Sequence, residues 1–204
     1  MKSYTPEQID EIIRRCQKGD RLSQQLIYEL FYGKMMGICM RYAGQKETAK
    51  DYLHDGFIKA FLKIKKFDFK GSFEGWLRRI IVNNIIDQIR KDKYSFVEID
   101  HTYDNRVAEY DKDFENEEDT SELNLLKKLN VNEILDQIQF LSPAYRTVFN
   151  LYIVEGLSHK EIADALNISE GSSKSNLARA KANMQKLLKK YYFNKYGNKE
   201  FKNV

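Results

Sequence analysis

The sequence predicts an all-α protein made of two small helical domains joined by an acidic flexible linker, with a helix-turn-helix in the second domain. Strand-like alternation of apolar and polar residues is nearly absent, and the 204 residues include only 2 prolines. Apolar residues instead recur three and four positions apart, which places them on one face of a helix. An acidic stretch with few aliphatic residues separates two such regions, and it cannot bury enough surface to fold by itself.

Four helices are expected in the first domain, residues 1–93. The first begins at Thr5, because Thr, Pro and Gln at positions 5, 6 and 8 supply a cap, a first-turn proline and a capping-box partner. Gly19 ends this helix. The other three are expected from about Asp20 to residue 42, over about 46–65, and from a Ser72 cap to about Lys91.

Residues 94–121 form the predicted linker. Residues 94–122 hold eleven acidic and two basic side chains, a net charge of −9 in a chain whose total is +4. The flanking regions are therefore basic, which favours polyanionic partners. The second domain, residues 122–191, is expected to contain a helix at about 122–140, a helix that starts at Ser142-Pro143, and the helix-turn-helix. A basic tail, residues 192–204, follows.

The helix-turn-helix covers residues 158–181. Ser158 and Glu161 form a capping box, Asn167 suits the left-handed conformation that ends the first helix, and Ser169 can cap the second. Hydroxyl, amide and basic groups crowd the outer face of the second helix, as in helices that enter a DNA major groove. The residues expected to meet duplex DNA are Ser173, Lys174, Ser175, Asn176, Ala178, Arg179 and Lys181. An ordinary helical hairpin with a solvated charged face would explain the same pattern.

A second nucleic-acid signature lies in residues 67–93. Aromatic side chains cluster around a glycine-containing loop, and basic and amide side chains follow on the next helix. This combination suits unstacked, single-stranded bases, whose edges side chains can reach. Trp76 is better explained as a core residue, Phe73 fits either role, and Asn84 on a partly apolar face needs a hydrogen-bond partner. The residues expected to contact the strand are Lys70, Ser72, Phe73, Arg78, Arg79, Asn84, Arg90 and Lys91.

Several classes of function find no support in the sequence. Cys16 and Cys39 match no metal spacing and no disulfide framework, which indicates a reducing cytosol. The three histidines are far apart, and we find no phosphate-binding glycine loop and no nucleophile with a paired base. We therefore expect no enzymatic activity, no metal and no cofactor. No signal peptide or membrane-spanning run is visible.

Taken together, these segments resemble bacterial sigma factors of the extracytoplasmic-function group, within the sigma-70 family. The resemblance covers almost the whole chain and rests on residues 51–91, the acidic linker and the C-terminal helix-turn-helix. It implies that the first domain is sigma region 2, which binds core RNA polymerase and melts and reads the promoter −10 element. The second domain would be region 4, which reads the −35 element as duplex. The implied polymerase contacts are Asp51, His54, Asp55 and Phe57.

The chain departs from the usual family pattern at a few positions. His54 stands where the family often has Gln, and Asn167 replaces the common Gly of the turn. Ser173 and Asn176 stand where Val and Arg are common. Because these last two lie on or near the reading face, the promoter preference cannot be transferred from relatives.

The resemblance implies a transcription initiation factor that binds core RNA polymerase and directs it to specific promoters. Its implied partners are the polymerase, promoter DNA in duplex and single-stranded form, and an anti-sigma factor, without membrane insertion. The expected location is the cytoplasm, at the nucleoid in holoenzyme or held at the membrane by an anti-sigma partner. One alternative is a free-standing helix-turn-helix regulator, which would have no use for a single-strand reader. Another is a nucleic-acid-modifying enzyme, for which the sequence offers no site.

Overall fold

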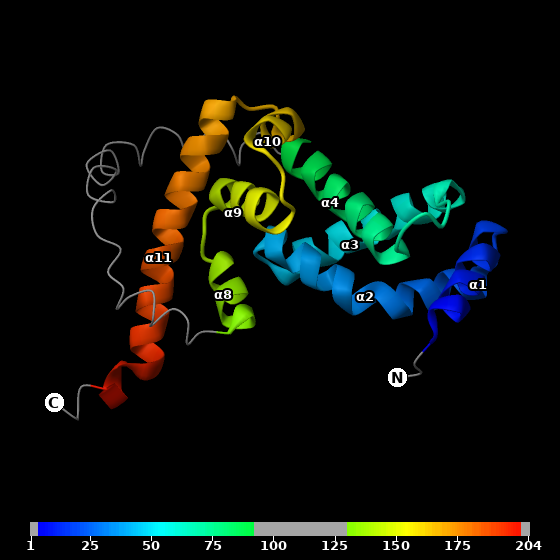
Figure 1. Ribbon diagram of the computed structural model, residues 1–204, viewed down its shortest axis with the longest axis horizontal. Coiled ribbons are helices and arrows are strands. Elements are labelled where there is room, and N and C mark those ends of the chain that lie inside the picture. Colours follow the sequence, from blue (N-terminus) through cyan, green and yellow to red (C-terminus); the bar gives the residue numbers. More distant parts are fainter. Residues whose placement is uncertain (1–3, 92–129, 201–204) are drawn as a thin grey trace. The chain divides into compact units, whose positions relative to one another are not determined.

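The computed structural model describes residues 4–91 and 130–200, which contain helices and no strands. The chain divides into two compact units, residues 1–88 and 89–204, and each is described by itself (Figure 1). The expected linker, residues 94–121, lies outside the described residues. Within the described ranges, no helix combines the length and the apolar character needed to span a membrane.

The first unit contains the four expected helices. They are α1 (Pro6–Gln17), α2 (Arg21–Ala43), α3 (Lys46–Lys63) with a short 3-10 turn at Ile64–Lys66, and α4 (Phe73–Lys91). The predicted capping box is confirmed, because the Gln8 amide N–H donates to Thr5 Oγ1 and the Thr5 amide N–H donates to Gln8 Oε1. Gly19 takes a φ of 91°, which ends α1 one residue before the Asp20 cap of α2.

Apolar side chains from all four helices form the core of this unit. Its fully buried members include Ile13, Ile27, Leu53, Leu77, Ile81 and Ile85. Helices α3 and α4 approach closely at Gly56, where an added Cβ would lie 2.3 Å from Ile81 Cδ1. Lys59 and Asp87 join the same two helices at 3.2 Å. The close approach fixes α4 against α3 and so sets which face of α4 remains at the surface.

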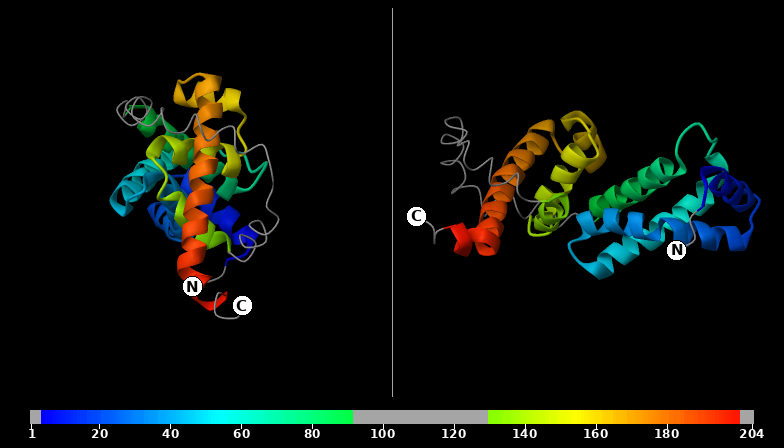
Figure 2. Two further views of the ribbon diagram at one scale, coloured as in Figure 1. Left: turned by 90° about the vertical axis from the view of Figure 1, so that its left-hand side faces the viewer. Right: turned by 60° about the horizontal axis from the view of Figure 1, so that its bottom comes forward.

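The second unit contains α8 (Val131–Ile138), α9 (Pro143–Phe149), a π-helical turn (Asn150–Val154), α10 (His159–Leu166) and α11 (Glu170–Glu200). The first part of the helix expected at about 122–140 lies outside the described residues, and α8 begins at Val131, where extended Asn130 caps it. Helix α11 runs through position 192, so the expected start of a separate tail falls inside one helix. Helix α11 packs against α9, which crosses it in the left view of Figure 2.

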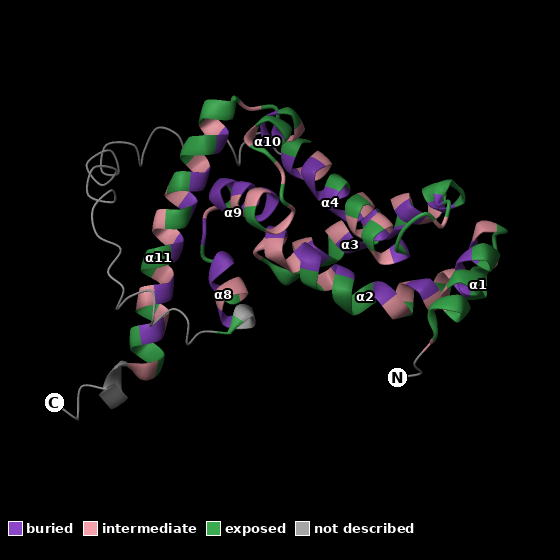
Figure 3. Ribbon diagram, in the orientation of Figure 1, coloured by how far each residue is buried: buried purple, intermediate pink, exposed green. Residues whose placement is uncertain are grey.

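The core of the second unit explains why α11 is so long. Buried residues recur along α11 and alternate with exposed ones (Figure 3). Ala180, Met184, Leu188 and Tyr192 pack with the buried side chains of α8 and α9, which include Ile138, Leu141, Ala144 and Tyr145. Burial of Tyr192 therefore fixes the part of α11 around this residue, for which the sequence alone did not distinguish fraying from packing.

A polar cluster joins the start of α8 to the far end of α11. Glu133 accepts hydrogen bonds from the Asn130 amide at 2.8 Å and from Tyr191 Oη at 3.2 Å, and it pairs with Lys195. The Lys195 ammonium, the Asn130 amide and Tyr191 favour the ionised carboxylate, so the pKa of Glu133 lies below its ordinary value of 4.5. The same ion pair raises the pKa of Lys195.

Candidate nucleic-acid interface

The helix-turn-helix forms at the predicted residues. The Glu161 amide donates to Ser158 Oγ at 3.3 Å, and Glu161 Oε2 accepts from the Ser158 amide at 2.8 Å, which completes the capping box. Asn167 takes a φ of 56° and ends α10. The Ser172 amide donates to Ser169 Oγ at 2.9 Å, which confirms Ser169 as the cap of α11.

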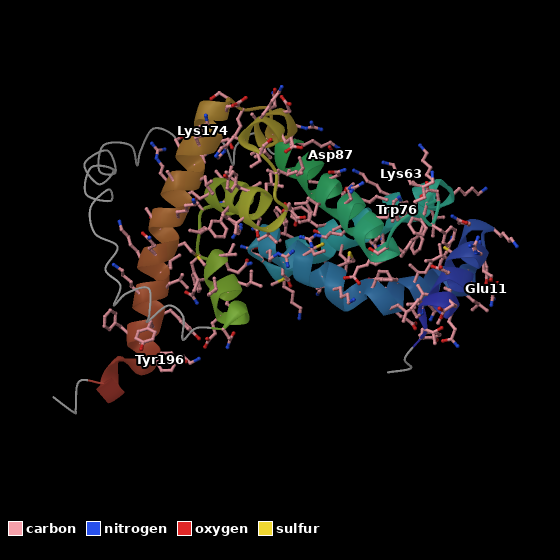
Figure 4. The ribbon with its side chains drawn as sticks, in the orientation of Figure 1. Glu11, Lys63, Trp76, Asp87, Lys174 and Tyr196 are labelled. Carbon is pink, nitrogen blue, oxygen red and sulfur yellow. The ribbon has the colours of Figure 1, made fainter. Side chains whose placement is uncertain are left out.

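The outer face of α11 carries most of the residues expected to meet duplex DNA. Lys174, Ser175, Ala178 and Lys181 are exposed, and Asn176 and Arg179 are half-buried. Lys174 lies near the N-terminal end of α11, and Tyr196 lies near its opposite end (Figure 4). Leu177 and Ala180 are buried, so the helix presents one polar face and one packed face as expected.

Ser173 is a correction to that set. Its side chain is 0% exposed, because position 173 shares the inner face of α11 with Leu177 and Ala180. Its Oγ lies 3.0 Å from His159 Nδ1. The His159 ring stacks on Tyr152, with ring centroids 4.7 Å apart and an interplanar angle of 26°. Ser173 therefore links α11 to α10 and does not face outward, and His159 is a positioning residue that the sequence pattern did not indicate.

Aromatic side chains cluster beneath the loop that precedes α4. The ring centroid of Phe67 lies 4.9 Å from that of Phe69, 5.2 Å from that of Phe73 and 5.6 Å from that of Trp76. Phe73 is only 6% exposed and also contacts Phe31 of α2, at 5.3 Å. Phe73 therefore packs as a core residue, which is one of the two roles that the sequence left open, and its expected strand contact stays a prediction.

The polar residues expected to contact a single strand divide in the same way. Lys70, Ser72, Arg79, Arg90 and Lys91 are exposed, and Arg78 is half-buried. Asn84 is 2% exposed, and its Nδ2 donates to the Tyr52 carbonyl oxygen of α3 at 3.1 Å. The predicted need for a partner is confirmed, because this hydrogen bond joins α3 to α4. The expected base contact of Asn84 stays a prediction.

Helix α1 holds this loop from the side. Gln17 Nε2 donates to the carbonyl oxygens of Ile64 and Phe67 at 3.0 and 2.8 Å. The Arg14 guanidinium carbon lies 4.1 Å from the centroid of the Phe69 ring. No sequence signal predicted this role for α1, because its contacts reach residues about 50 positions away.

One face of α3 combines acidic and apolar side chains. Asp51, His54 and Asp55 are exposed, and the same face carries Ile58 and Leu62, of which Leu62 is 79% exposed. Gln88 Nε2 of α4 donates to Asp55 Oδ2 at 2.8 Å.

Phe57 does not belong to this face. Its side chain is 2% exposed, and its ring centroid lies 4.7 Å from that of Tyr28, so its expected polymerase contact is corrected to a core role. Ile58 and Leu62 are the apolar groups that the sequence reasoning missed. They stand at helical spacing from Asp51 and Asp55, which is the signal that could have found them.

The described side chains offer little for chemistry. Within residues 4–91 and 130–200, no cluster of three or more His, Cys, Asp or Glu side chains could hold a metal ion. Burial raises the pKa of Cys16 to about 11 and that of Cys39 to about 12, so neither thiol is a ready nucleophile.

Comparison with known proteins agrees with this arrangement. The sequence profile of sigma-70 region 2 matches residues 27–94, and that of sigma-70 region 4 matches residues 132–184. The ECF RNA polymerase sigma factor SigW of Bacillus subtilis is 32% identical over 189 residues, which cover 89% of this chain and 97% of SigW. The RNA polymerase sigma-H factor of Pseudomonas aeruginosa is 26% identical over 196 residues, which cover 90% and 95%.

A solved complex of the sigma factor RpoE with the anti-sigma factor NepR from Bartonella quintana matches at 21% identity and a TM-score of 0.44. It covers 81% of this chain and 96% of that chain. The two matched regions and the SigW relationship carry the assignment. The chain belongs to the extracytoplasmic-function group of the sigma-70 family of non-enzymatic initiation factors, and it is an RNA polymerase sigma factor that directs promoter recognition, not a free-standing regulator.

Proposed function

We propose that the two units read two promoter elements in two different forms. Residues 1–93 act as sigma region 2 and read the −10 element as a melted strand, and residues 122–191 act as region 4 and read the −35 element as duplex. The observation that carries this proposal is the presence of two unlike surfaces in one chain. One is an aromatic loop with a basic helix, and the other is a helix-turn-helix with a polar outer face.

The strand-reading surface consists of the exposed end of the loop and the outer face of α4. Lys70 and Ser72 are exposed on the loop, and Arg79, Arg90 and Lys91 are exposed along the helix. Cationic side chains at such positions can follow the phosphates of an extruded strand, while aromatic groups stack its bases. Phe73 and Asn84 support this surface from inside.

The duplex-reading surface is the exposed face of α11. Asn176 has the amide geometry that suits adenine, and Arg179 and Lys174 can meet guanine or phosphate. Ser158 and Glu161 fix the start of α10, and the Ser169 cap fixes the start of α11. A helix-turn-helix places its second helix in the major groove, and these caps define the turn that precedes that helix.

The α3 face is proposed as the polymerase contact. Asp51 and Asp55 supply charge, and Ile58 and Leu62 supply exposed apolar surface further along the helix. Such a mixed face fits a basic, partly apolar helical partner. We further propose that an anti-sigma factor binds this α3 face and so competes with the polymerase. The proposed location of the chain is the cytoplasm.

The test is transcription by the purified full chain with core RNA polymerase from the same organism. The expected result is specific initiation from a set of promoters that core enzyme alone does not use. Failure of the chain to co-purify with core polymerase, or initiation indistinguishable from that of core enzyme, would contradict the proposal. Binding of the isolated chain to duplex DNA with full specificity would favour a mode of action independent of polymerase.

A further inference from the structure

Phe69 has a backbone conformation that is unusual for a bulky residue. Its φ is 63°, and Asn167 is the other non-glycine residue with a positive φ among the described residues. Asn tolerates this region because its short side chain can bond locally, whereas a phenylalanine side chain is strained there. Such strain persists only where surrounding contacts hold the residue in place, and it is common at functional sites.

Two contacts hold the Phe69 ring. The Arg14 guanidinium lies over the ring at 4.1 Å, and the Phe67 ring lies 4.9 Å away at an interplanar angle of 56°. We call the space bounded by Arg14 and Phe67 the Arg14 slot. The start of the loop is fixed by the two Gln17 hydrogen bonds, while Phe69 is half-buried and Lys70 and Ser72 beyond it are exposed.

Guanidinium planes and aromatic rings are the two kinds of surface on which proteins stack unpaired bases. The Arg14 slot offers both, directly beside the exposed end of the proposed strand-reading loop. The Phe69 ring, supplied by the chain itself, occupies it. Arg14 belongs to α1, which precedes residues 27–94 and so lies outside the matched region 2.

We infer that the Phe69 ring is a placeholder for a base. An unstacked base of the non-template strand enters the Arg14 slot, stacks on Arg14 and displaces the Phe69 ring. Residue 69 then leaves the left-handed region, and the relieved strain offsets part of the free energy of exposing the phenyl ring. This inference rests on the proposed function, because it requires that loop 67–73 meets a melted strand.

The exchange requires a second conformation of the loop after Phe67. Gln17 anchors the loop at Ile64 and Phe67, so the proposed movement involves the residues that follow Phe67. The Lys70 amide donates to Asp68 Oδ1 at 3.2 Å, and the two side chains pair at 3.2 Å on the surface. These exposed contacts are weak enough to exchange with solvent. The free energy of base binding in the slot is therefore the difference between the contacts of a base and those of the phenyl ring that it replaces.

The experiment compares Phe69→Gly and Arg14→Ala in the full chain bound to core polymerase. The probe is a pool of single-stranded DNA oligonucleotides of random sequence, and the measurement is the affinity of holoenzyme for it. Phe69→Gly removes the ring that a base must displace and tolerates the left-handed conformation, so the remaining cost of exposing that ring disappears and we expect binding about tenfold tighter. Phe69→Ala, which empties the slot but keeps a Cβ at position 69, should also tighten binding.

Arg14→Ala should weaken binding, and in the Phe69→Gly background it should remove the gain. Arg15→Ala is the matched control: it removes the same charge from the next residue of α1, where Arg15 instead pairs with Asp20 at 2.6 Å. Arg15→Ala should leave the oligonucleotide affinity close to that of the parent. Thermal unfolding of each variant checks that the chain remains folded.

The outcomes separate the two proposals. A parent holoenzyme that binds single-stranded DNA no better than core enzyme would overturn the proposed function. A parent that binds, together with Phe69 variants that bind more weakly, would show that Phe69 is itself a stacking surface and would overturn the placeholder. If Phe69→Gly tightens oligonucleotide binding equally in the Arg14→Ala background, the base does not stack on Arg14 and the proposed Arg14 slot is wrong.

Discussion

His159 Nδ1 and Ser173 Oγ lie 3.0 Å apart and join the first helix of the helix-turn-helix to the inner face of the second. The contact is enclosed, because Ser173 is fully buried and the His159 ring stacks on Tyr152. A buried hydroxyl without a partner is costly. The sequence therefore pairs an unusual inner-face serine with a ring that satisfies it, and the angle between α10 and α11 depends on both.

This pair is expected to show coupling in a double-mutant cycle. His159→Ala leaves the Ser173 hydroxyl buried and unsatisfied, so it should lower the free energy of unfolding by about 1–2 kcal/mol. Ser173→Ala removes the hydroxyl and should rescue part of that loss. The measurement is chemical denaturation of the full chain. Ser175→Ala, an exposed serine of the same helix, is the control, and strict additivity of the two single variants would show that the contact contributes nothing.

The Glu133 cluster predicts a specific dependence of stability on pH. The pKa of Glu133 in the folded chain is lowered, first by the hydrogen bond from Lys195 and then by the Asn130 amide. A depressed carboxyl pKa contributes stability above the unfolded value of 4.5, and this contribution is lost as pH falls through the lower folded pKa. Glu133→Gln should therefore lower the Tm at neutral pH, and its difference from the parent should shrink below about pH 4.

Two variants serve as controls for this pH effect. Asp136→Asn removes an exposed acid of the same helix, and Lys190→Ala removes an exposed base of α11. Neither should reproduce the loss seen with Glu133→Gln or Lys195→Ala at neutral pH. A Tm difference for Glu133→Gln that stays constant from neutral to acid pH would show that the carboxylate charge is not what stabilises the cluster.

Gly56 predicts a loss of stability from a single methyl group. A Cβ at this position would lie 2.3 Å from Ile81 Cδ1, and Ile81 is fully buried, so its side chain must shift within a packed core. Gly56→Ala should destabilise the chain by about 1–3 kcal/mol. At Gly37 of α2 nothing lies within 4 Å of an added Cβ. Gly37→Ala should therefore be neutral or raise the Tm through helix propensity, and equal effects at both positions would contradict the packing argument.

The local features of this fold were readable from the sequence. Thr5, Asp20, Ser142 and Ser158 cap helices where their patterns indicated. Caps and turns depend on residues within a few positions of each other, so sequence spacing contains the needed information.

Two side chains were assigned against their helical periodicity. Ser173 stands four residues before Leu177 on the inner face of α11, and Phe57 stands four after Leu53 on that of α3. The polarity of Ser173 suggested an outward role, whereas the polymerase contact of Phe57 was implied by the family resemblance alone. The contacts of Arg14 with Phe69 and of Glu133 with Lys195 join positions more than 50 residues apart. Only the packed structure brings such groups together.

The α3 face predicts a loss of polymerase binding without loss of fold. Asp51→Arg combined with Asp55→Arg should weaken binding to core polymerase by more than about a hundredfold, because the changes place like charges against a basic partner. Asp10→Arg with Glu11→Arg makes the same change of charge on exposed acids of α1 and is the matched control. Circular dichroism checks the fold, since Asp55 also accepts from Gln88. Unchanged affinity for core polymerase would remove α3 from the polymerase interface.

We expect two kinds of DNA contact on the outer face of α11: some residues determine which promoter sequence is bound, and others raise the affinity for every sequence. Asn176 lies half-buried on the first turns of α11, where a short amide can reach a base edge, while Lys181 is exposed and further along. A paired base contact is worth about 1–3 kcal/mol of discrimination, whereas a phosphate contact weakens binding to all sequences alike. Asn176→Ala should therefore change the upstream sequence that holoenzyme selects from a promoter library. Arg179→Ala should do the same if its guanidinium meets a base.

Lys181→Ala should leave the selected sequence unchanged, lower the affinity for every promoter, and reduce the dependence of binding on salt by about one released counterion. Ser173→Ala adds a sharper control. Because its hydroxyl faces His159, any change in selected sequence must come through a shift of α11 and should be matched by His159→Ala. If Asn176→Ala and Arg179→Ala both select the parental upstream sequence while Lys181→Ala alters it, α11 contacts DNA in a different register from the one proposed.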